Sequence, residues 1–204
     1  MATQPMLVGN TALIVIDIQK SAFSDVESGI PVMPGYTENM RQARKLIDVA
    51  HETGTPVIFF QEIHRRNKID YGRELDGSED IHCLEGEPGT PVAAEEMDMR
   101  DTDYFIHKRR YSCFFGTELE ILLKGLKAQT LILVGGMTDV CVHYTFVDAH
   151  QHDYYVRVAD DCVGGTSTEA HQASLNAMEY LQSGALRSSE AIISELRQHD
   201  SKAA

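Results

Sequence analysis

One stretch of the chain decides the fold class: Leu131-Ile-Leu-Val-Gly-Gly-Met-Thr-Asp-Val-Cys141. Its first four residues are aliphatic and do not alternate with polar ones, which predicts a strand buried on both faces of a parallel sheet. Two glycines end this strand, and a helix is expected to follow with Thr138 or Asp139 as its N-cap. Cys141 then lies in the first helical turn, where free backbone N–H groups favour the thiolate. The stretch therefore predicts a reactive cysteine at the edge of a sheet.

Further apolar runs and helical patterns alternate along the chain. Strands are predicted at 11–17, 56–60, 104–108 and 154–159, and helices at 37–50, 117–126, 167–182 and within 186–197. Thr37 is expected to cap the first of these helices, and Thr117 with Glu120 to form a capping box at the second. This alternation predicts an α/β fold: a three-layer doubly wound sheet, mostly parallel, with helices on both faces. The length of 204 residues favours a single domain over 1–204.

Composition excludes several classes of function. The net charge of −13 argues against a nucleic-acid partner, which requires a basic face. No apolar run reaches the length of a membrane span, and the first residues lack the pattern of a signal peptide. Four cysteines stand without CxxC spacing, as expected for free thiols in a cytoplasmic protein.

Three residues of different chemistry end or follow predicted strands. Asp17 ends the first strand, Lys108 ends the third and Cys141 follows the fourth. Each has an ordinary structural interpretation, as a loop cap, part of a surface charge run or a small core residue. Parallel sheets, however, bind ligands beyond the carboxyl ends of their strands. An acid, a cation and a thiol at one edge indicate a site.

These residues stand in sequences that resemble the isochorismatase-like cysteine hydrolases. The similar segments are Ile16-Asp-Ile-Gln19, Lys108-Arg-Arg-Tyr-Ser-Cys-Phe-Phe-Gly-Thr117 and Gly136-Met-Thr-Asp-Val-Cys-Val142. The resemblance extends from about residue 11 to residue 186 and implies the same doubly wound fold. It implies a catalytic triad of Asp17, Lys108 and Cys141. It also implies a cis Gly136–Met137 peptide bond that aims the N–H groups of Met137 and Cys141 at an oxyanion, no cofactor, and assembly as a homo-oligomer, either dimer or tetramer.

The chain departs from one branch of this family. Nicotinamidases bind a metal through an Asp-x-His pair after the second strand, whereas this chain has Gln61-Glu-Ile-His64. We therefore predict no metal site and no metal requirement, with His64 and His82 left open as ligands. True isochorismatases, which cleave a vinyl ether, lack the cysteine. The resemblance thus implies a cysteine-dependent amidohydrolase that cleaves a small amide, ureido or carbamoyl compound through a thioester and releases ammonia. A vinyl-ether hydrolase and a non-catalytic small-molecule-binding protein are the alternatives.

Other residues are candidates for binding the substrate. Gln19 is expected to orient Asp17 or the substrate, and Phe23, Tyr104 and Phe114 are expected to form the pocket wall. The irregular segment 61–101 and the loop after Asp17 are expected to set specificity. Several arginines are candidates to hold a substrate carboxylate: Arg65, Arg66, Arg73, Arg109 and Arg110.

Two other enzyme classes fit the sequence less well. A papain-like protease needs a histidine beside the cysteine, and His143 lies only two positions after Cys141 on the same helix, so it cannot face the thiol. A dinucleotide-binding oxidoreductase is disfavoured because no GxGxxG segment follows any predicted strand.

Overall fold

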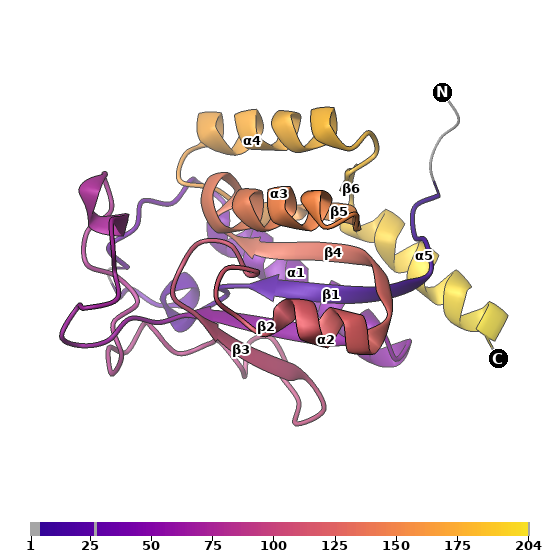
Figure 1. Cartoon of the computed structure of the whole chain (residues 1–204), viewed down its shortest axis with the longest axis horizontal. Helices are drawn as coiled ribbons and strands as arrows, with labels where there is room; N and C mark the ends of the chain where they lie inside the picture. Colours follow the sequence, from indigo (N-terminus) through magenta and orange to yellow (C-terminus); the bar gives the residue numbers. More distant parts are fainter. Residues whose placement is uncertain (1–4, 27, 204) are drawn as a thin grey trace.

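The computed structural model describes residues 5–26 and 28–203, with the side chains up to residue 199. Six strands form one sheet in the order β3-β2-β1-β4-β5-β6, and every neighbouring pair is parallel (Figure 1). The strands are β1 (Asn10–Ile16), β2 (Val57–Glu62), β3 (Tyr104–Lys108), β4 (Ala128–Gly136), β5 (Tyr155–Gly164) and β6 (Leu186–Arg187). The chain runs outward from β1 to β3 and returns to β4 beside β1. The strand order therefore reverses between β1 and β4, where ligands bind in such sheets.

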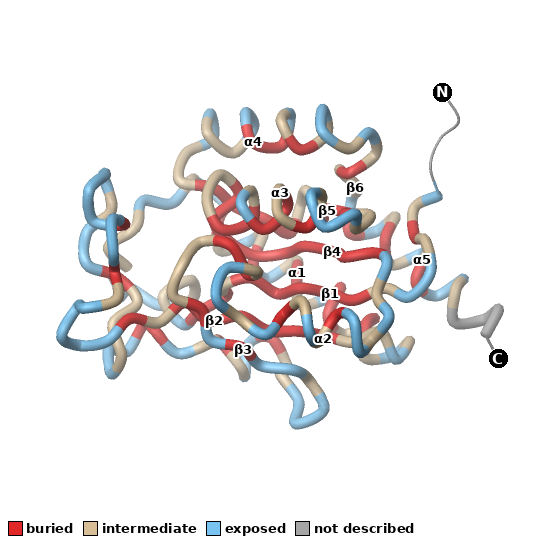
Figure 2. The backbone as a smooth tube through the Cα atoms, in the orientation of Figure 1, coloured by how far each residue is buried: buried red, intermediate tan, exposed pale blue. Residues whose placement is uncertain are grey.

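Helices cover both faces of this sheet, as predicted. Helices α1 (Tyr36–Glu52) and α5 (Ser189–Ala203) pack on one face, and α2 (Leu119–Leu126), α3 (His143–Gln151) and α4 (Thr168–Leu181) pack on the other (Figure 1). Leu13 and Val15 face the first layer, whereas Ile14 and Ile16 face the second. Figure 2 shows that the central strands are buried along their length. The continuous apolar runs are thus explained by two cores, one on each face.

Two strands extend beyond their predicted ends. The second strand was predicted to stop at Phe60, but β2 continues through Gln61 and Glu62, because Glu62 pairs in register with Lys108 of β3. Strand β5 continues to Gly164, and the two-residue strand β6 was not predicted. The extension of β2 matters most, because it brings Glu62 to the carboxyl edge of the sheet.

The predicted side-chain caps of α1 and α2 are wrong. Helix α1 begins after Gly35, and Thr37 lies inside it. Helix α2 begins at Leu119 without a capping box, and Glu120 instead pairs with Lys124 one turn later. Local spacing favoured these caps, but the polar side chains contact neighbouring loops and charged residues instead.

The segment between β4 and α3 differs from the expected helix start. The two glycines belong to β4, and Thr138–Val142 forms a single π-helical turn that precedes α3. Asp139 does not cap the turn, because its carboxylate accepts hydrogen bonds from the backbone and hydroxyl of Thr166. Cys141 therefore lies in a π turn. No helix in the described part of the chain is long and apolar enough to cross a membrane.

Candidate active site

The structure brings together the three residues that the sequence placed at one edge. Lys108 Nζ lies 2.8 Å from Asp17 Oδ2 and 3.4 Å from Cys141 Sγ. Asp17 follows β1 and Cys141 follows β4, so the two flank the point where the strand order reverses. Lys108 reaches them from the end of β3, and it is only 1% exposed. An acid, an ammonium and a thiol thus meet at the carboxyl edge of the sheet.

Asp17 is held in place by its backbone conformation and by β2. It has a left-handed φ of 51°, which is uncommon for a residue with a side chain. Its N–H donates to the Phe60 carbonyl at 3.2 Å, and its Oδ1 accepts from the Glu62 N–H at 2.8 Å. The second oxygen, Oδ2, remains for Lys108. These contacts fix the direction of the carboxylate toward the thiol.

Glu62 is the functional-site residue that the sequence did not identify. Its Oε2 lies 2.5 Å from Lys108 Nζ and 3.6 Å from Cys141 Sγ, so the ammonium contacts two carboxylates. The signal in the sequence is the Gln-Glu pair that ends β2, because a buried parallel strand with this ending directs one of the two polar side chains to the edge of the sheet. The site is therefore a buried group of four charged or ionisable side chains.

The charges of Lys108 and Glu62 stabilise each other. Burial opposes the charge on Lys108, but Asp17, Cys141 and Glu62 outweigh burial and hold its pKa well above the usual value. Burial likewise opposes the charge on Glu62. Lys108, together with hydrogen bonds from His64 and His82, outweighs it and holds the pKa of Glu62 well below the usual value. An ammonium and a carboxylate are therefore both present in the resting site.

Burial raises the pKa values of both Asp17 and Cys141. Burial raises the pKa of Asp17 to about 6, although Lys108 acts in the opposite direction. Burial also raises the pKa of the Cys141 thiol well above its usual value; Lys108 lowers it, whereas Glu62 and Asp17 raise it further. The expectation that the helix start would favour a resting thiolate does not hold, because burial and two carboxylates oppose the negative charge. The thiol needs a base.

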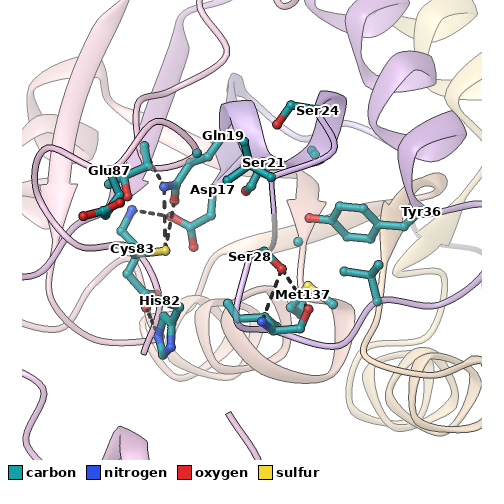
Figure 3. Close-up of a pocket in the computed structure, with 18 of the residues that line it drawn as sticks. Asp17, Gln19, Ser21, Ser24, Ser28, Tyr36, His82, Cys83, Glu87 and Met137 are labelled. Carbon is teal, nitrogen blue, oxygen red and sulfur yellow. Dashed lines mark hydrogen bonds and ion pairs between the residues drawn. The ribbon is translucent and has the colours of Figure 1, made fainter. Parts of the chain in front are cut away.

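A cavity of about 510 Å³ opens onto the thiol and the Asp17 carboxylate. Figure 3 shows Asp17, Gln19 and Cys83 on one side of it and Tyr36 and Met137 on the other. The polar lining is rich in hydroxyl groups and carboxylates: Ser21, Ser24, Ser28, Thr37, Thr90, Asp25, Glu62 and Glu87. The apolar lining comes mainly from the loops after β1 and β2: Ala22, Val26, Ile30, Val32, Ile81 and Leu84.

Of the predicted pocket residues, only Gln19 lines this cavity. Its amide donates to the Thr90 carbonyl. The predicted wall of Phe23, Tyr104 and Phe114 is wrong. Phe23 packs against the core under α1, Tyr104 begins β3 at the opposite end from Lys108, and Phe114 stacks on His152. The aromatic residue that lines the cavity is Tyr36, which the helical pattern had assigned to no role.

The peptide bond between Gly136 and Met137 is cis, as the family resemblance implied. Met137 lines the cavity, and its carbonyl accepts hydrogen bonds from the N–H groups of Val140 and Val142 at 3.0 and 3.1 Å. A Cβ at position 136 would lie 2.2 Å from the Tyr36 hydroxyl, which explains the glycine there. The turn that carries Cys141 is thus organised around the Met137 carbonyl.

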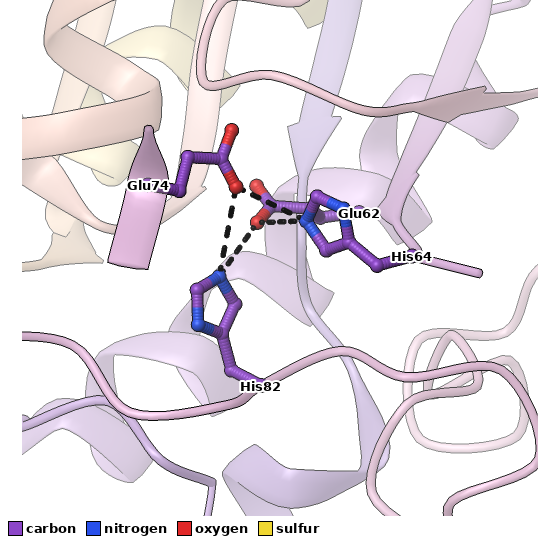
Figure 4. A group of neighbouring side chains, drawn as sticks. All are labelled: Glu62, His64, Glu74 and His82. Carbon is purple, nitrogen blue, oxygen red and sulfur yellow. Dashed lines mark hydrogen bonds and ion pairs between the residues drawn. The ribbon is translucent and has the colours of Figure 1, made fainter. Parts of the chain in front are cut away.

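A second group of side chains adjoins this site: Glu62, His64, Glu74 and His82, all buried (Figure 4). His82 Nε2 lies 3.1 Å from Glu62 Oε1, and His64 Nε2 lies 3.1 Å from Glu74 Oε2. One potential ligand atom from each residue lies within 4.8 Å of the others. Hydrogen bonds to Glu62 and Glu74 outweigh burial and raise the pKa of His64 to about 9.

The residues of this group fit a divalent metal. Both carboxylate oxygens of Glu74 are buried; Oε2 faces His64 at 3.1 Å, whereas Oε1 is 3.9 Å from Arg110 Nη1, too far for a hydrogen bond. His82 Nδ1 is 2.7 Å from the Asp80 carbonyl, so Nε2, which contacts Glu62 in this structure, is the ring nitrogen that faces the other residues of the group. Two imidazoles and two carboxylates are a usual ligand set for zinc and similar ions. The sequence-based prediction of no metal site stays a prediction, but Glu62 and His64, two residues apart, form with Glu74 and His82 a group that could hold a metal ion.

The doubly wound fold is that of a family of hydrolases. The isochorismatase domain family matches residues 11–191, and the chain belongs to that family. A probable inactive nicotinamidase of Arabidopsis thaliana is 29% identical over 81% of this chain and 86% of its own length. The ureidoacrylate amidohydrolase RutB of Acinetobacter baylyi is 30% identical over 81% of this chain and 75% of its own length. The crystal structure of an isochorismatase-like hydrolase from Alkaliphilus metalliredigens superposes with a TM-score of 0.78 at 25% identity, covering 92% of this chain and 99% of that one. The chain is thus a hydrolase of a family whose named members include amidohydrolases.

Proposed function

We propose that this protein is a cysteine-dependent amidohydrolase that cleaves the C–N bond of a small amide, ureido or carbamoyl compound and releases ammonia. One observation carries the proposal: Lys108 Nζ lies between the Asp17 carboxylate, at 2.8 Å, and the Cys141 thiol, at 3.4 Å, at the end of a cavity. A thiol beside a carboxylate base and a cation is equipped for nucleophilic attack on a carbonyl carbon. A vinyl-ether hydrolase or a non-catalytic protein would not require this arrangement.

The first half of the reaction forms a thioester. Asp17, with its pKa near 6, accepts the proton of the Cys141 thiol as the sulfur attacks the carbonyl carbon. Lys108 stays protonated and stabilises the sulfur while the proton is leaving. The N–H groups of Met137 and Cys141 are the proposed donors to the oxyanion of the tetrahedral intermediate. When the intermediate collapses, Asp17 returns the proton to the nitrogen, the C–N bond breaks and ammonia leaves.

The second half of the reaction restores the thiol. Asp17, ionised again, removes a proton from a water molecule that attacks the thioester carbon. The C–S bond breaks, and the proton held by Asp17 returns to the Cys141 sulfur. The product is a carboxylic or carbamic acid. A divalent metal held by Glu62, His64, Glu74 and His82 would supply a Lewis acid beside the cavity. None of the steps above requires it.

Ammonia release from a panel of small primary amides and ureido compounds tests this proposal. We expect at least one compound to release ammonia, and we expect the release to disappear in Cys141→Ala while that variant still binds the compound. Cys162→Ala is the matched control, because Cys162 is a buried free thiol in the core under α1. Hydroxylamine should divert the thioester to a hydroxamate. Ammonia release that persists in Cys141→Ala would refute the nucleophile and the mechanism.

A further inference from the structure

The wall of the active-site cavity carries an excess of negative charge. The described residues that line it include four carboxylates, Asp17, Asp25, Glu62 and Glu87, and neither lysine nor arginine. The ammonium of Lys108 is buried behind this lining and already contacts two of those carboxylates. A substrate in the cavity therefore meets a negative field that this ammonium only partly balances.

The arginines that the sequence offered for a substrate carboxylate do not line the cavity. Each pairs with an acidic side chain instead: Arg65 with Glu85, Arg66 with Glu87, Arg73 with Asp76, Arg109 with Asp70, and Arg110 with Glu74. Only the Arg66 pair reaches the cavity, through Glu87. Its charged atoms are 4.0 Å apart and both side chains are more than half exposed, so Arg66 neutralises little of the Glu87 charge.

Asp25 and Glu87 are the carboxylates available to a substrate at the mouth. Both are exposed and line the cavity from different loops, Asp25 after β1 and Glu87 after β2. Asp17 and Glu62, by contrast, are held by Lys108 near the thiol. A substrate whose amide carbon lies at Cys141 directs its other end away from Lys108, toward the hydroxyl groups and the two exposed carboxylates.

We propose that the cavity selects its amide by charge: it accepts uncharged and positively charged primary amides and ureido compounds and rejects those that carry a carboxylate. This inference rests on the proposed amidohydrolase function. Asp25 and Glu87 are the specificity-determining residues. Ureidoacrylate, the compound named for the RutB relative, is a carboxylate, and by this argument it is a poor substrate here. A carboxylate in the cavity loses its hydration and meets neither lysine nor arginine among the described residues that line it.

Two charged thiol reagents measure the field at Cys141 without any amide turnover. A methanethiosulfonate transfers its alkylthio group to the thiolate, forming a disulfide and releasing methanesulfinate. We compare the cationic 2-aminoethyl reagent with the anionic 2-sulfonatoethyl reagent in a Cys83→Ser background, because Cys83 also lines the cavity. The rate of each reagent with Cys141 is divided by its rate with 2-mercaptoethanol, and the reagent ratio is the cationic value over the anionic value. This ratio should be at least about ten. The ratio should fall at least about five-fold in Asp25→Asn/Glu87→Gln, because each lost charge attracted the cationic reagent and repelled the anionic one. It should not change in Glu190→Gln, an exposed acid on α5.

Three amides of equal length then test the substrate class. They are 3-aminopropanamide, butanamide and succinamate, whose distal groups are cationic, neutral and anionic. Ammonia release should follow that order, and higher ionic strength should slow the first and speed the last. A reagent ratio at or below one, or succinamate as the best of the three, overturns the charge selection while leaving the amidohydrolase proposal intact. If none of the three releases ammonia, the reagent ratio alone decides the charge selection. The amidohydrolase proposal has its own test: it is refuted if ammonia release persists in Cys141→Ala.

Discussion

Lys108 is the residue on which the charges of the site depend. Its ammonium contacts Asp17, Glu62 and Cys141, and its side chain has no exposed surface. A charge buried to this extent is stable only when partners replace its lost hydration. The same ammonium that holds two carboxylates together also stabilises the thiolate as it forms, so structure and proposed catalysis share one group.

Replacing this lysine tests both roles at once. We expect Lys108→Met to lose about 10²-fold or more in kcat, because one electrostatic contact to a developing charge is lost. We also expect it to lower the free energy of unfolding by about 3 kcal/mol, because Asp17 and Glu62 are left without their cation. Steady-state kinetics and urea denaturation measure the two effects.

Two further variants separate stability from catalysis. Adding Glu62→Gln to Lys108→Met should restore part of the stability and none of the activity. Lys124→Met, which removes an exposed lysine paired with Glu120, should leave both quantities unchanged. Normal turnover in a well-folded Lys108→Met protein would show that this lysine has no part in the chemistry.

Asp17 sets the acid side of the pH profile. Its pKa, raised by burial to about 6, is that of the proposed base, which works only when ionised. We therefore expect kcat/KM to fall about ten-fold per pH unit below pH 6 and to level off above pH 7. A profile that stays flat between pH 5 and 7 would contradict the assignment of Asp17.

Stability should change in the opposite direction over this range. The pKa of Asp17 is higher in the folded protein than its ordinary value of 3.8, so the folded state binds this proton more tightly. The stabilisation that Asp17 contributes is therefore complete below about pH 4 and is lost as the pH rises through 6. Thermal denaturation at each pH shows whether the rise in activity has a folding origin, which we do not expect.

At the scale of secondary-structure elements, the Gly135–Gly136 pair positions the nucleophile. Gly135 has a φ of +115° at the end of β4, and a Cβ there would lie 2.0 Å from the Ile16 carbonyl oxygen. Only glycine combines this conformation with so close an approach of two backbones. The pair thus lets β4 run beside β1 up to the point where the chain turns toward Cys141.

Gly135→Ala should be strongly destabilising. We expect a loss on the order of 3 kcal/mol, because the strained φ and the contact with backbone cannot both be relieved. Gly125 in α2 is the matched control: nothing lies within 4 Å of its Cβ position, and Gly125→Ala should stabilise the helix by about 0.5 kcal/mol. Urea denaturation of both variants measures the contrast. Equal stabilities would show that β4 and β1 can shift apart.

At the scale of the whole molecule, three segments of the chain form the group of Glu62, His64, Glu74 and His82. Its residues come from the end of β2, from the short 3₁₀ helix Glu74–Asp76 and from the loop that follows. We expect it to bind one Zn²⁺ per chain, measured by calorimetric titration of chelator-treated protein. His82→Gln should weaken binding at least ten-fold, whereas His152→Gln, an exposed residue outside the group, should not.

The need for a metal is a separate question from its binding. That activity requires no metal stays a prediction, although the residues of this group fit a metal ion. Because the proposed steps use only Asp17, Lys108, Cys141 and the backbone N–H of Met137, chelated protein should release ammonia at an unchanged rate. Metal content measured before and after chelation is the control. A rate restored only by added metal would contradict the prediction.

The sequence by itself predicted the layers of this fold and the edge that carries the site. Apolar runs such as 131–134 are long enough to indicate strands buried on both faces, and this periodicity is a local property of the chain. Asp17, Lys108 and Cys141 could be grouped because they end or follow such strands. The cis bond at Gly136 was implied by the family resemblance.

Only the tertiary structure decided what surrounds these three residues. Glu62 joined them because β2 pairs with β3 through Lys108, a contact between segments 46 residues apart. Tyr36, and not Phe23, Tyr104 or Phe114, lines the cavity, because the first residue of α1 lies against Gly136 and Gly164. The resting thiol also follows from burial among carboxylates rather than from its place at a helix start. Local sequence specifies which strands form, whereas burial and long-range pairing determine which charges meet, and the field at Cys141 depends on those charges.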